Sequence, residues 1–324
     1  MNSDVLALDC EAEVARIGSW MTRVLTRDLR KRGVVLGLSG GVDSSVCAAL
    51  AVRALGPKHV FGILMPETDS ASVSTERGRS VAEQLGIPHE LKNIAPAVAA
   101  LGCYELRDSA IRDIFPDYGA GWASKVAIAG GAQGGVNYFK LVVQSPAGVV
   151  SEARMPIKQY LQVVAATSFK QRTRKMLEYF HADRLNYAVI GTPNRLEYDQ
   201  GFFVKNGDGA ADLKPIAHLY KTQVYALARH LGLPEDVCTS VPTTDTYSMQ
   251  QGQDEFYFAL PYQQMDYALW GHNHGVPAAE VAQLLGLPVE RIQFVYGDIE
   301  AKRRATASLH ARPYLVDDIP EIGA

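Results

Sequence analysis

A stretch rich in glycine and hydroxyl side chains, with one carboxylate, stands near the start of the chain as SGGVDSS at positions 39–45. It follows an apolar, β-branched run at 34–38 and precedes a helical pattern, so we expect it to join a buried strand to a helix N-terminus. Such an N-terminus carries unpaired N–H donors and partial positive charge, and glycines let the backbone approach a bound group. Asp43 would repel a phosphate unless a divalent cation bridged them. The loop therefore predicts a cradle for a nucleotide polyphosphate with a metal ion.

Three other interpretations of this loop are less favoured. The letters GLSGG at 37–41 match the nucleophile elbow of hydrolases, but an elbow normally follows several strands and leaves Asp43 without a role. A Walker A loop is excluded because no Gly-Lys-Ser or Gly-Lys-Thr follows. A purely structural turn is the remaining alternative. Six specified positions between a strand and a helix favour instead the Ser-Gly-Gly-x-Asp-Ser loop of enzymes that split ATP between its α- and β-phosphates.

A second group of polar residues follows another predicted strand, at 187–190. It reads GTPNRLE at 191–197, GFFVK at 201–205 and GDGAAD at 207–212. Ligands of open α/β sheets bind where the strands end, which is where this group begins. Several carboxylates and a lysine in so short a segment favour a ligand site, with a solvated glycine turn as the alternative.

These motifs, in this order, resemble the ammonia-dependent NAD synthetases, which are members of the N-type ATP pyrophosphatase family. Further matching segments are LKPI at 213–216, LYKTQ at 219–223, PTTD at 242–245, and Asp254 with Glu255. The resemblance covers roughly residues 10–95 and 165–310 and leaves the middle of the chain outside it. It implies a homodimer that binds ATP, Mg²⁺, deamido-NAD and ammonia.

The resemblance also implies roles for particular residues. The ATP-binding residues would be Ser39, Gly40, Gly41, Asp43, Ser44, Ser45, Arg174, Thr192, Lys221 and Thr243. The substrate-binding residues would be Arg172, Lys205, Asp208, Asp212 and Lys302. Asp43 and Glu197 would hold Mg²⁺, and the catalytic residues would be Lys221, Asp208 and Asp43. The arginines have an alternative interpretation as surface charges, and KRR at 302–304 has one as a solvated helix face.

The chemistry of such a reaction fits these residue types. A carboxylate does not react with ammonia until it carries a leaving group. Attack of the carboxylate on the α-phosphate of ATP gives an acyl-adenylate, in which AMP is that leaving group. Negative charge then grows on phosphate oxygens, where Mg²⁺, Lys221 and the N–H groups of the loop would stabilise it. A buried carboxylate such as Asp208 would bind the ammonium ion or accept its proton.

The sequence departs from the family pattern in three places. Ser168 stands where the family usually has asparagine, the segment PETDS at 66–70 is unusual, and 102–161 is an insertion. These departures leave two alternatives open: a related ligase acting on a different carboxylate, and a non-catalytic nucleotide-binding subunit. The glutamine-dependent relatives carry an extra amidase domain that we do not expect here. Ammonia is therefore expected to be free or to come from a separate subunit.

The elements that position these residues alternate between strands and helices. We expect an α/β fold in one domain over 1–324: a doubly wound parallel sheet with helices on both faces, and a helical C-terminal appendage at about 255–310. The insertion at about 102–161 contains a glycine-rich stretch at 130–135. It is either an inserted subdomain or a long mobile segment.

The composition is that of an ordinary globular protein. Net charge is −3 and 47% of the 324 residues are hydrophobic, so nucleic acid is not an expected partner. No apolar run reaches the roughly 20 residues of a membrane span. Four cysteines without a CxxC pair and the lack of a signal-peptide pattern lead us to expect a cytoplasmic protein. His272 and His274 have metal-ligand spacing, but a polar loop between helices is favoured.

Overall fold

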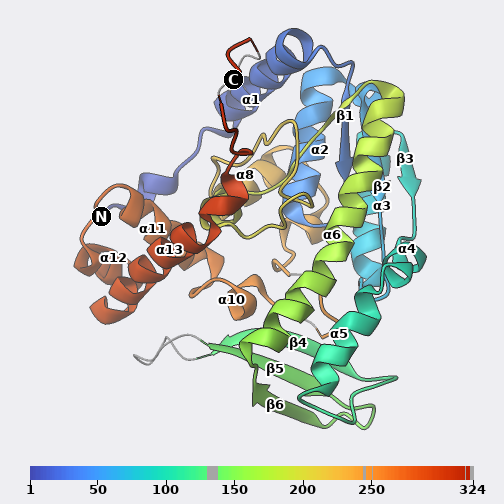
Figure 1. The fold of residues 1–324 in the computed structure, drawn as a ribbon. Coiled ribbons are helices and arrows are strands. Elements are labelled where there is room, and N and C mark those ends of the chain that lie inside the picture. The colour runs from blue at the N-terminus through green and yellow to red at the C-terminus, as the bar shows by residue number, and fades with distance from the viewer. Residues whose placement is uncertain (130–137, 244–245, 250, 318, 322–324) are drawn as a thin grey trace.

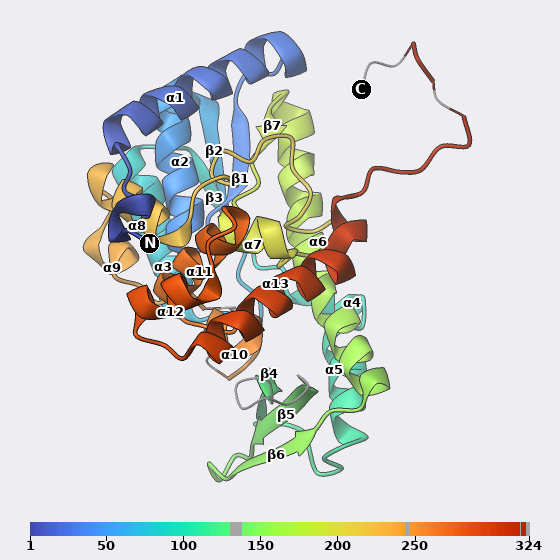
Figure 2. The same cartoon turned by 90° about the vertical axis from the view of Figure 1, so that its left-hand side faces the viewer.

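Four parallel strands form the centre of the protein, seen in a computed structural model that describes residues 1–129, 138–243, 246–249, 251–317 and 319–321. The strands are β1 (Val34–Gly37), β2 (Val60–Leu64), β3 (His89–Leu91) and β7 (Ala188–Val189), in the order β3-β2-β1-β7. Figure 1 shows β1, β2 and β3, and Figure 2 shows β7 as well. The sequence-predicted stretch at 130–135, Thr244 and Asp245 lie outside the described residues, as do the side chains of Asp254 and Glu255.

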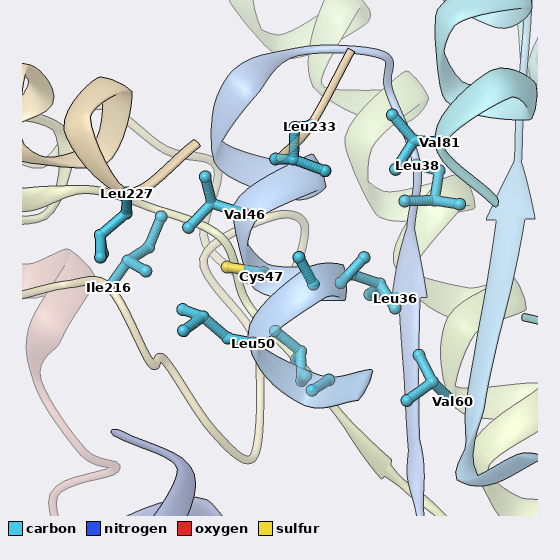
Figure 3. Close-up of a cluster of buried hydrophobic side chains, with 14 of the residues drawn as sticks. Leu36, Leu38, Val46, Cys47, Leu50, Val60, Val81, Ile216, Leu227 and Leu233 are labelled. Atoms are coloured by element: carbon cyan, nitrogen blue, oxygen red, sulfur yellow. The ribbon is translucent and has the colours of Figure 1, made fainter. Parts of the chain in front are cut away.

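Helices cover both faces of this sheet because successive strand residues point to opposite sides. Val34 and Leu36 pack with apolar residues of α1 (Cys10–Arg23), α2 (Val42–Leu55), α3 (Ser72–Leu85) and α8 (Lys221–His230). Figure 3 shows part of this core, with Leu36 of β1 and Val60 of β2 facing Cys47 and Leu50 of α2. Val35 packs on the other side, against α4 (Ala95–Ala100) and α6 (Ile157–Leu185). The predicted parallel sheet with helices on both faces is thereby confirmed.

The insertion contains a second sheet. After α5 (Cys103–Arg112), the strands β4 (Ala123–Ala129), β5 (Tyr138–Gln144) and β6 (Val150–Arg154) pair antiparallel in the order β4-β5-β6. Their apolar residues form a core of their own with Val163 of α6 and Ile111 of α5. Figure 2 shows this sheet below the central one, at the N-terminal end of the long helix α6. The described part of the insertion is an ordered subdomain.

The C-terminal third is helical, as predicted. The helices α11 (Tyr262–Asn273), α12 (Ala278–Leu285) and α13 (Val289–His310) surround a separate core with Leu196 of α7 (Arg195–Gln200). Phe256 of the short helix α10 (Gln253–Phe256) packs instead against the core of the insertion. The remaining helical turns are η1 (Ser3–Leu6), η2 (Val24–Leu29), η3 (Pro57–His59) and α9 (Glu235–Cys238). None of the helices described here is long and apolar enough to cross a membrane.

Candidate active site

A cavity of about 650 Å³ opens where β1, β2 and β7 end. Its walls include the 37–44 loop, the ends of β2 and β7, one side of α6, and residues after α7. Phe139 from the insertion and Thr306 from α13 complete it. The carboxyl ends of parallel strands are the usual place for a ligand in such a sheet, so this cavity is the candidate active site.

The loop between β1 and α2 has the features expected of an anion cradle. Gly40 has a φ of +78°, and a Cβ there would collide with the backbone carbonyl of Ser74. Gly41 is the N-cap of α2, and its carbonyl accepts bonds from the hydroxyls of Ser44 (3.1 Å) and Ser45 (2.8 Å). The hydroxyls of Ser39 and Ser44 lie 3.1 Å apart. Hydroxyl groups and a helix N-terminus thus surround the space in which phosphates would lie.

Asp43 in the first turn of α2 is held by two side chains from distant parts of the chain. One carboxylate oxygen accepts a bond from Asn194 Nδ2 at 3.2 Å. The other contacts the ammonium group of Lys221, the first residue of α8, whose side chain is buried. The N-terminus of α8 is itself fixed, because the Asp266 carboxylate accepts the backbone N–H groups of Lys221 (3.2 Å) and Thr222 (2.7 Å). The ammonium group and the carboxylate therefore lie together on rigid elements.

Glu197 adds a second, partly buried carboxylate beside this ion pair. Its oxygens accept bonds from Gln253 Nε2 (2.9 Å) and from the backbone N–H of Asn194 (3.2 Å), which caps α7. Burial, and then the negative charge of Asp43, raise the pKa of Glu197 to about 7. Burial disfavours the charged form of Lys221, but the carboxylates of Asp43 and Glu197 outweigh it and raise the pKa of that amine. Two carboxylates thus share one ammonium group.

This donor set fits a magnesium ion. Mg²⁺ prefers oxygen ligands and usually takes one or two carboxylates together with substrate phosphates and water. Asp43 and Glu197 supply two carboxylates next to the phosphate cradle, and Lys221 is the cation that Asp43 contacts there. In the described part of the chain, no group of three or more His, Cys, Asp or Glu could hold a metal alone. The phosphates of a nucleotide would therefore complete the set.

Basic side chains line the opposite wall, on α6 and the loop after α7. Arg174 donates to the carbonyl of Met65 at 3.2 Å, at the end of β2. Arg172 donates to the carbonyl of Lys205 at 3.3 Å, and Lys205 Nζ donates to the carbonyl of Ser308 at 2.7 Å. All three basic residues line the cavity. Their side chains connect α6, the 201–205 segment and α13 around the same space.

A buried acidic pair occupies the wall next to these arginines. Asp208 lines the cavity, and its carboxylate accepts the backbone N–H of Val204 at 2.7 Å. Burial raises the pKa of Asp208 and also that of Glu178 on α6. Lys175 Nζ donates to Glu178 Oε2 at 2.6 Å. Sequence reasoning missed Lys175 and Glu178, although charged residues three apart on the buried side of a helix are the signal that could have found them.

The structure gathers most of the predicted site residues. Those that line the cavity are Ser39, Gly40, Gly41, Asp43, Ser44, Arg172, Arg174, Thr192, Glu197, Lys205, Asp208, Lys221 and Thr243. Three predicted residues are not among the described residues that line the cavity: Ser45, Asp212 and Lys302. The Asp212 carboxylate instead accepts the backbone N–H of Val189 at 2.7 Å, and Lys302 Nζ donates to Tyr257 O (2.5 Å) and Asp298 (2.6 Å). These side chains hold neighbouring elements in place.

Two further sequence features are also located. His272 contacts Glu300 at 3.3 Å, whereas His274 Nδ1 lies 2.8 Å from the carbonyl of Trp270, so the two histidines do not share a site. Ser168 lines the cavity, as do Phe139 of the insertion and Tyr160 of α6, whose ring centroids lie 3.7 Å apart in a stacked arrangement. The insertion therefore forms part of the cavity wall, which sequence reasoning left open.

Comparisons with known proteins agree with this geometry. A family model described as NAD synthase matches residues 13–114 and 129–305, which includes much of the insertion. The NH(3)-dependent NAD(+) synthetase of Rhizobium meliloti (strain 1021) is 58% identical over 322 residues, which covers 99% of this chain and 96% of the relative.

Two solved structures share the fold at lower identity. The NH3-dependent NAD synthetase of Campylobacter jejuni has a TM-score of 0.60 and 21% identity, covering 96% of this chain and all of its own. The NMN synthetase of Francisella tularensis has a TM-score of 0.61 and 22% identity with the same coverage. Because the family model matches most of the chain and the relative is similar over its whole length, this chain belongs to the NAD synthase family.

Proposed function

We propose that this protein makes NAD⁺ from deamido-NAD⁺ and ammonia, with ATP converted to AMP and pyrophosphate. The observation that carries the proposal is the contact between Lys221 and Asp43, beside Glu197, at the N-terminus of α2. A module that only bound nucleotide would have no need to bury this ammonium group with two carboxylates. The 58% identity to an enzyme named for this reaction supports it.

In the first step, the loop at 39–44 holds the β- and γ-phosphates through its hydroxyls and N–H groups. The substrate carboxylate attacks the α-phosphorus and pyrophosphate leaves. Lys221 presents its ammonium group to the negative charge that grows on the α-phosphate oxygens. Asp43 and Glu197 would hold Mg²⁺, which when bound neutralises phosphate charge.

In the second step, ammonia attacks the activated carbonyl and AMP leaves. Ammonium carries a proton that must be lost before its nitrogen is nucleophilic. Asp208 is suited to take that proton, because it lines the cavity and burial has raised its pKa above the ordinary value of an aspartate. Arg172 and Lys205 would hold the rest of the acceptor on the same wall.

A second candidate is the same ligation on a different carboxylate. The NMN synthetase of Francisella tularensis shares this fold, so the fold does not decide the acceptor. The insertion also shapes the cavity through Phe139, and Ser168 lines the same cavity. Deamido-NAD is favoured, because the relative at 58% identity is named for NAD⁺ and the shared motifs continue through the acceptor side.

A homodimer belongs to the same proposal. Large apolar side chains are exposed along α6, among them Ile157 (67%), Met176 (62%) and Phe180 (59%), and a partner subunit would bury them. Ammonia would enter free or from a separate subunit. Light scattering tests the dimer, which predicts twice the chain mass of 35.3 kDa.

The experiment that tests the function is an acceptor screen that measures pyrophosphate and AMP. We expect release of both to depend on deamido-NAD⁺ and on ammonium, with glutamine ineffective as nitrogen donor. If another substrate with a nicotinate carboxylate is converted and deamido-NAD⁺ is not, the second candidate function is correct. No AMP with any acceptor would exclude both.

A further inference from the structure

A buried ionic cluster lies outside the catalytic loop and has no part in the reaction steps above. At its centre is Lys170 of α6, whose side chain is 1% exposed. Its ammonium group donates to Glu67 Oε1 (3.0 Å), to Asp69 Oδ2 (2.6 Å) and to the carbonyl of Thr246 (2.8 Å). Three acceptors match the three donors of an ammonium group, so its hydrogen-bonding capacity is used completely.

The fully buried charges of the cluster balance, and Arg107 also donates to the partly exposed carboxylate of Asp108 at 2.8 Å. Arg107 of α5 donates to Asp69 Oδ2 at 2.6 Å, and Tyr104 of the same helix donates to Glu67 Oε2 at 2.8 Å. The side chains of Lys170, Glu67, Asp69 and Arg107 are each at most 8% exposed. Two cations therefore face two carboxylates without solvent. Desolvating four charges is costly, and apolar side chains of similar volume could fill the space, so the cluster suggests a purpose beyond stability.

The cluster connects three segments that do not otherwise form one element. Glu67 and Asp69 belong to the segment after β2, Thr246 belongs to the segment after α9, and Arg107 comes from the insertion. The segment at 65–70 supplies Met65, Pro66 and Ser70 to the cavity wall, and the segment after α9 supplies Thr243 and Thr246 in addition. Lys170 is not among the described lining residues, so it would act on the cavity through these segments.

Arg174 binds the segment at 65–70 from the cavity side. It lies four residues after Lys170, one turn along the same side of α6. Its guanidinium donates to the carbonyl of Met65 (3.2 Å) and to the hydroxyl of Ser70 (3.5 Å). The segment at 65–70 is therefore held at two points of one helix, by Arg174 facing the cavity and by Lys170 behind it.

We propose that Lys170 is a positioning residue for ATP, which fixes the 65–70 segment and Thr246 against α6 so that the nucleotide wall is formed before ATP binds. The proposal rests on the proposed function, since it takes the wall around Arg174 and Thr243 as the ATP side of the cavity. A binding site that is already formed loses less conformational entropy when its ligand binds. Loss of the bonds made by Lys170 should therefore weaken ATP binding more than acceptor binding.

The test must separate positioning from folding. Lys170→Met alone leaves two buried carboxylates with one cation, Arg107, so we pair it with Glu67→Gln, which leaves Arg107 opposite Asp69 and restores the charge balance. A second balanced variant, Asp69→Asn with Arg107→Gln, leaves Lys170 opposite Glu67. Lys140→Met is the matched control, because it removes a lysine from an exposed ion pair with Glu152 on the insertion. Each variant is first shown to melt cooperatively near the wild-type temperature.

For Lys170→Met with Glu67→Gln we expect KM for ATP to rise about tenfold, with KM for the acceptor changed less than about twofold. Asp69→Asn with Arg107→Gln keeps the bonds of Lys170 to Glu67 and Thr246, so it should raise KM for ATP by a smaller factor. The dissociation constant of ATP with a methylene bridge between its α- and β-phosphorus should rise equally, and Lys140→Met should change none of these values. The proposal would be overturned if a balanced variant that folds bound the nucleotide as tightly as the wild type. It would also be overturned if KM for ATP and KM for the acceptor rose equally. Binding of the analogue needs no turnover, so this result remains readable even if the proposed reaction fails.

Discussion

Glu197→Gln provides a quantitative test of the carboxylate pair formed by Asp43 and Glu197. In the folded protein, burial and the charge of Asp43 hold the pKa of Glu197 at about 7, whereas an unfolded glutamate titrates near 4.5. Between these values the folded state binds more protons than the unfolded state, so stability falls as pH rises through this window. A pKa of about 7 in place of 4.5 lowers the free energy of unfolding by about 3 kcal/mol, an effect that is complete only above pH 7.

Glu197→Gln removes this pH-dependent loss of stability and adds a smaller loss that comes from a missing hydrogen bond. A glutamine has one acceptor oxygen where Glu197 has two, so either the bond from Gln253 or that from Asn194 is lost, at about 1 kcal/mol. That loss is the same at every pH. The difference in unfolding free energy between variant and wild type should therefore move in favour of the variant by about 2–3 kcal/mol from pH 5 to pH 8.

The assay is urea unfolding at both pH values, followed by tryptophan fluorescence in the presence of a chelator and without nucleotide. Glu83→Gln is the control, because Glu83 is exposed on α3 and its replacement should give no such pH-dependent change. If the difference between Glu197→Gln and wild type is equal at pH 5 and pH 8, Asp43 and Glu197 do not form such a carboxylate pair and the metal assignment loses its basis.

Three further substitutions test other parts of the site. Gly40→Ala should lower stability by about 2 kcal/mol and abolish binding of the ATP analogue, because φ is +78° and Cβ meets a backbone carbonyl; calorimetry measures both. Lys221→Met should lower kcat at least about a hundredfold by removing the ammonium group beside Asp43, whereas an unchanged kcat would exclude its catalytic role. Arg303→Met breaks two bonds of 2.6 and 2.8 Å to Asp199, so α13 should become sensitive to limited proteolysis.

The phosphate loop was predictable because its signals are local. An apolar run, two glycines and a helical pattern lie within a few residues of one another, and each constrains the backbone directly. The contact between Lys221 and Asp43 is different, because 178 positions separate the two residues. No local periodicity brings them together. The resemblance to a family predicted that both serve ATP, and the strand order β3-β2-β1-β7 then explains how they meet.

The start of α6 and the Lys170 cluster escaped sequence reasoning for related reasons. We expected the insertion to extend to about 161, whereas α6 already begins at Ile157. The side chains of Ile157 and Leu161 are 67% and 56% exposed, whereas that of Lys170 is buried. This is the reverse of the usual amphipathic pattern, in which apolar residues of a helix are buried and charged residues are exposed. A lysine in a helix is normally read as solvated. Only its partners in distant segments, Glu67, Asp69 and Thr246, make its burial possible.

The central claim is that the substrate carboxylate attacks the α-phosphorus before ammonia enters. Isotope transfer tests this most directly, with deamido-NAD⁺ carrying ¹⁸O in its nicotinate carboxylate and mass spectrometry of all products. Through an acyl-adenylate, one labelled oxygen bridges carbon and phosphorus and leaves with AMP, so AMP should gain one ¹⁸O and pyrophosphate none. Unlabelled AMP, or label in pyrophosphate, would contradict the proposed mechanism.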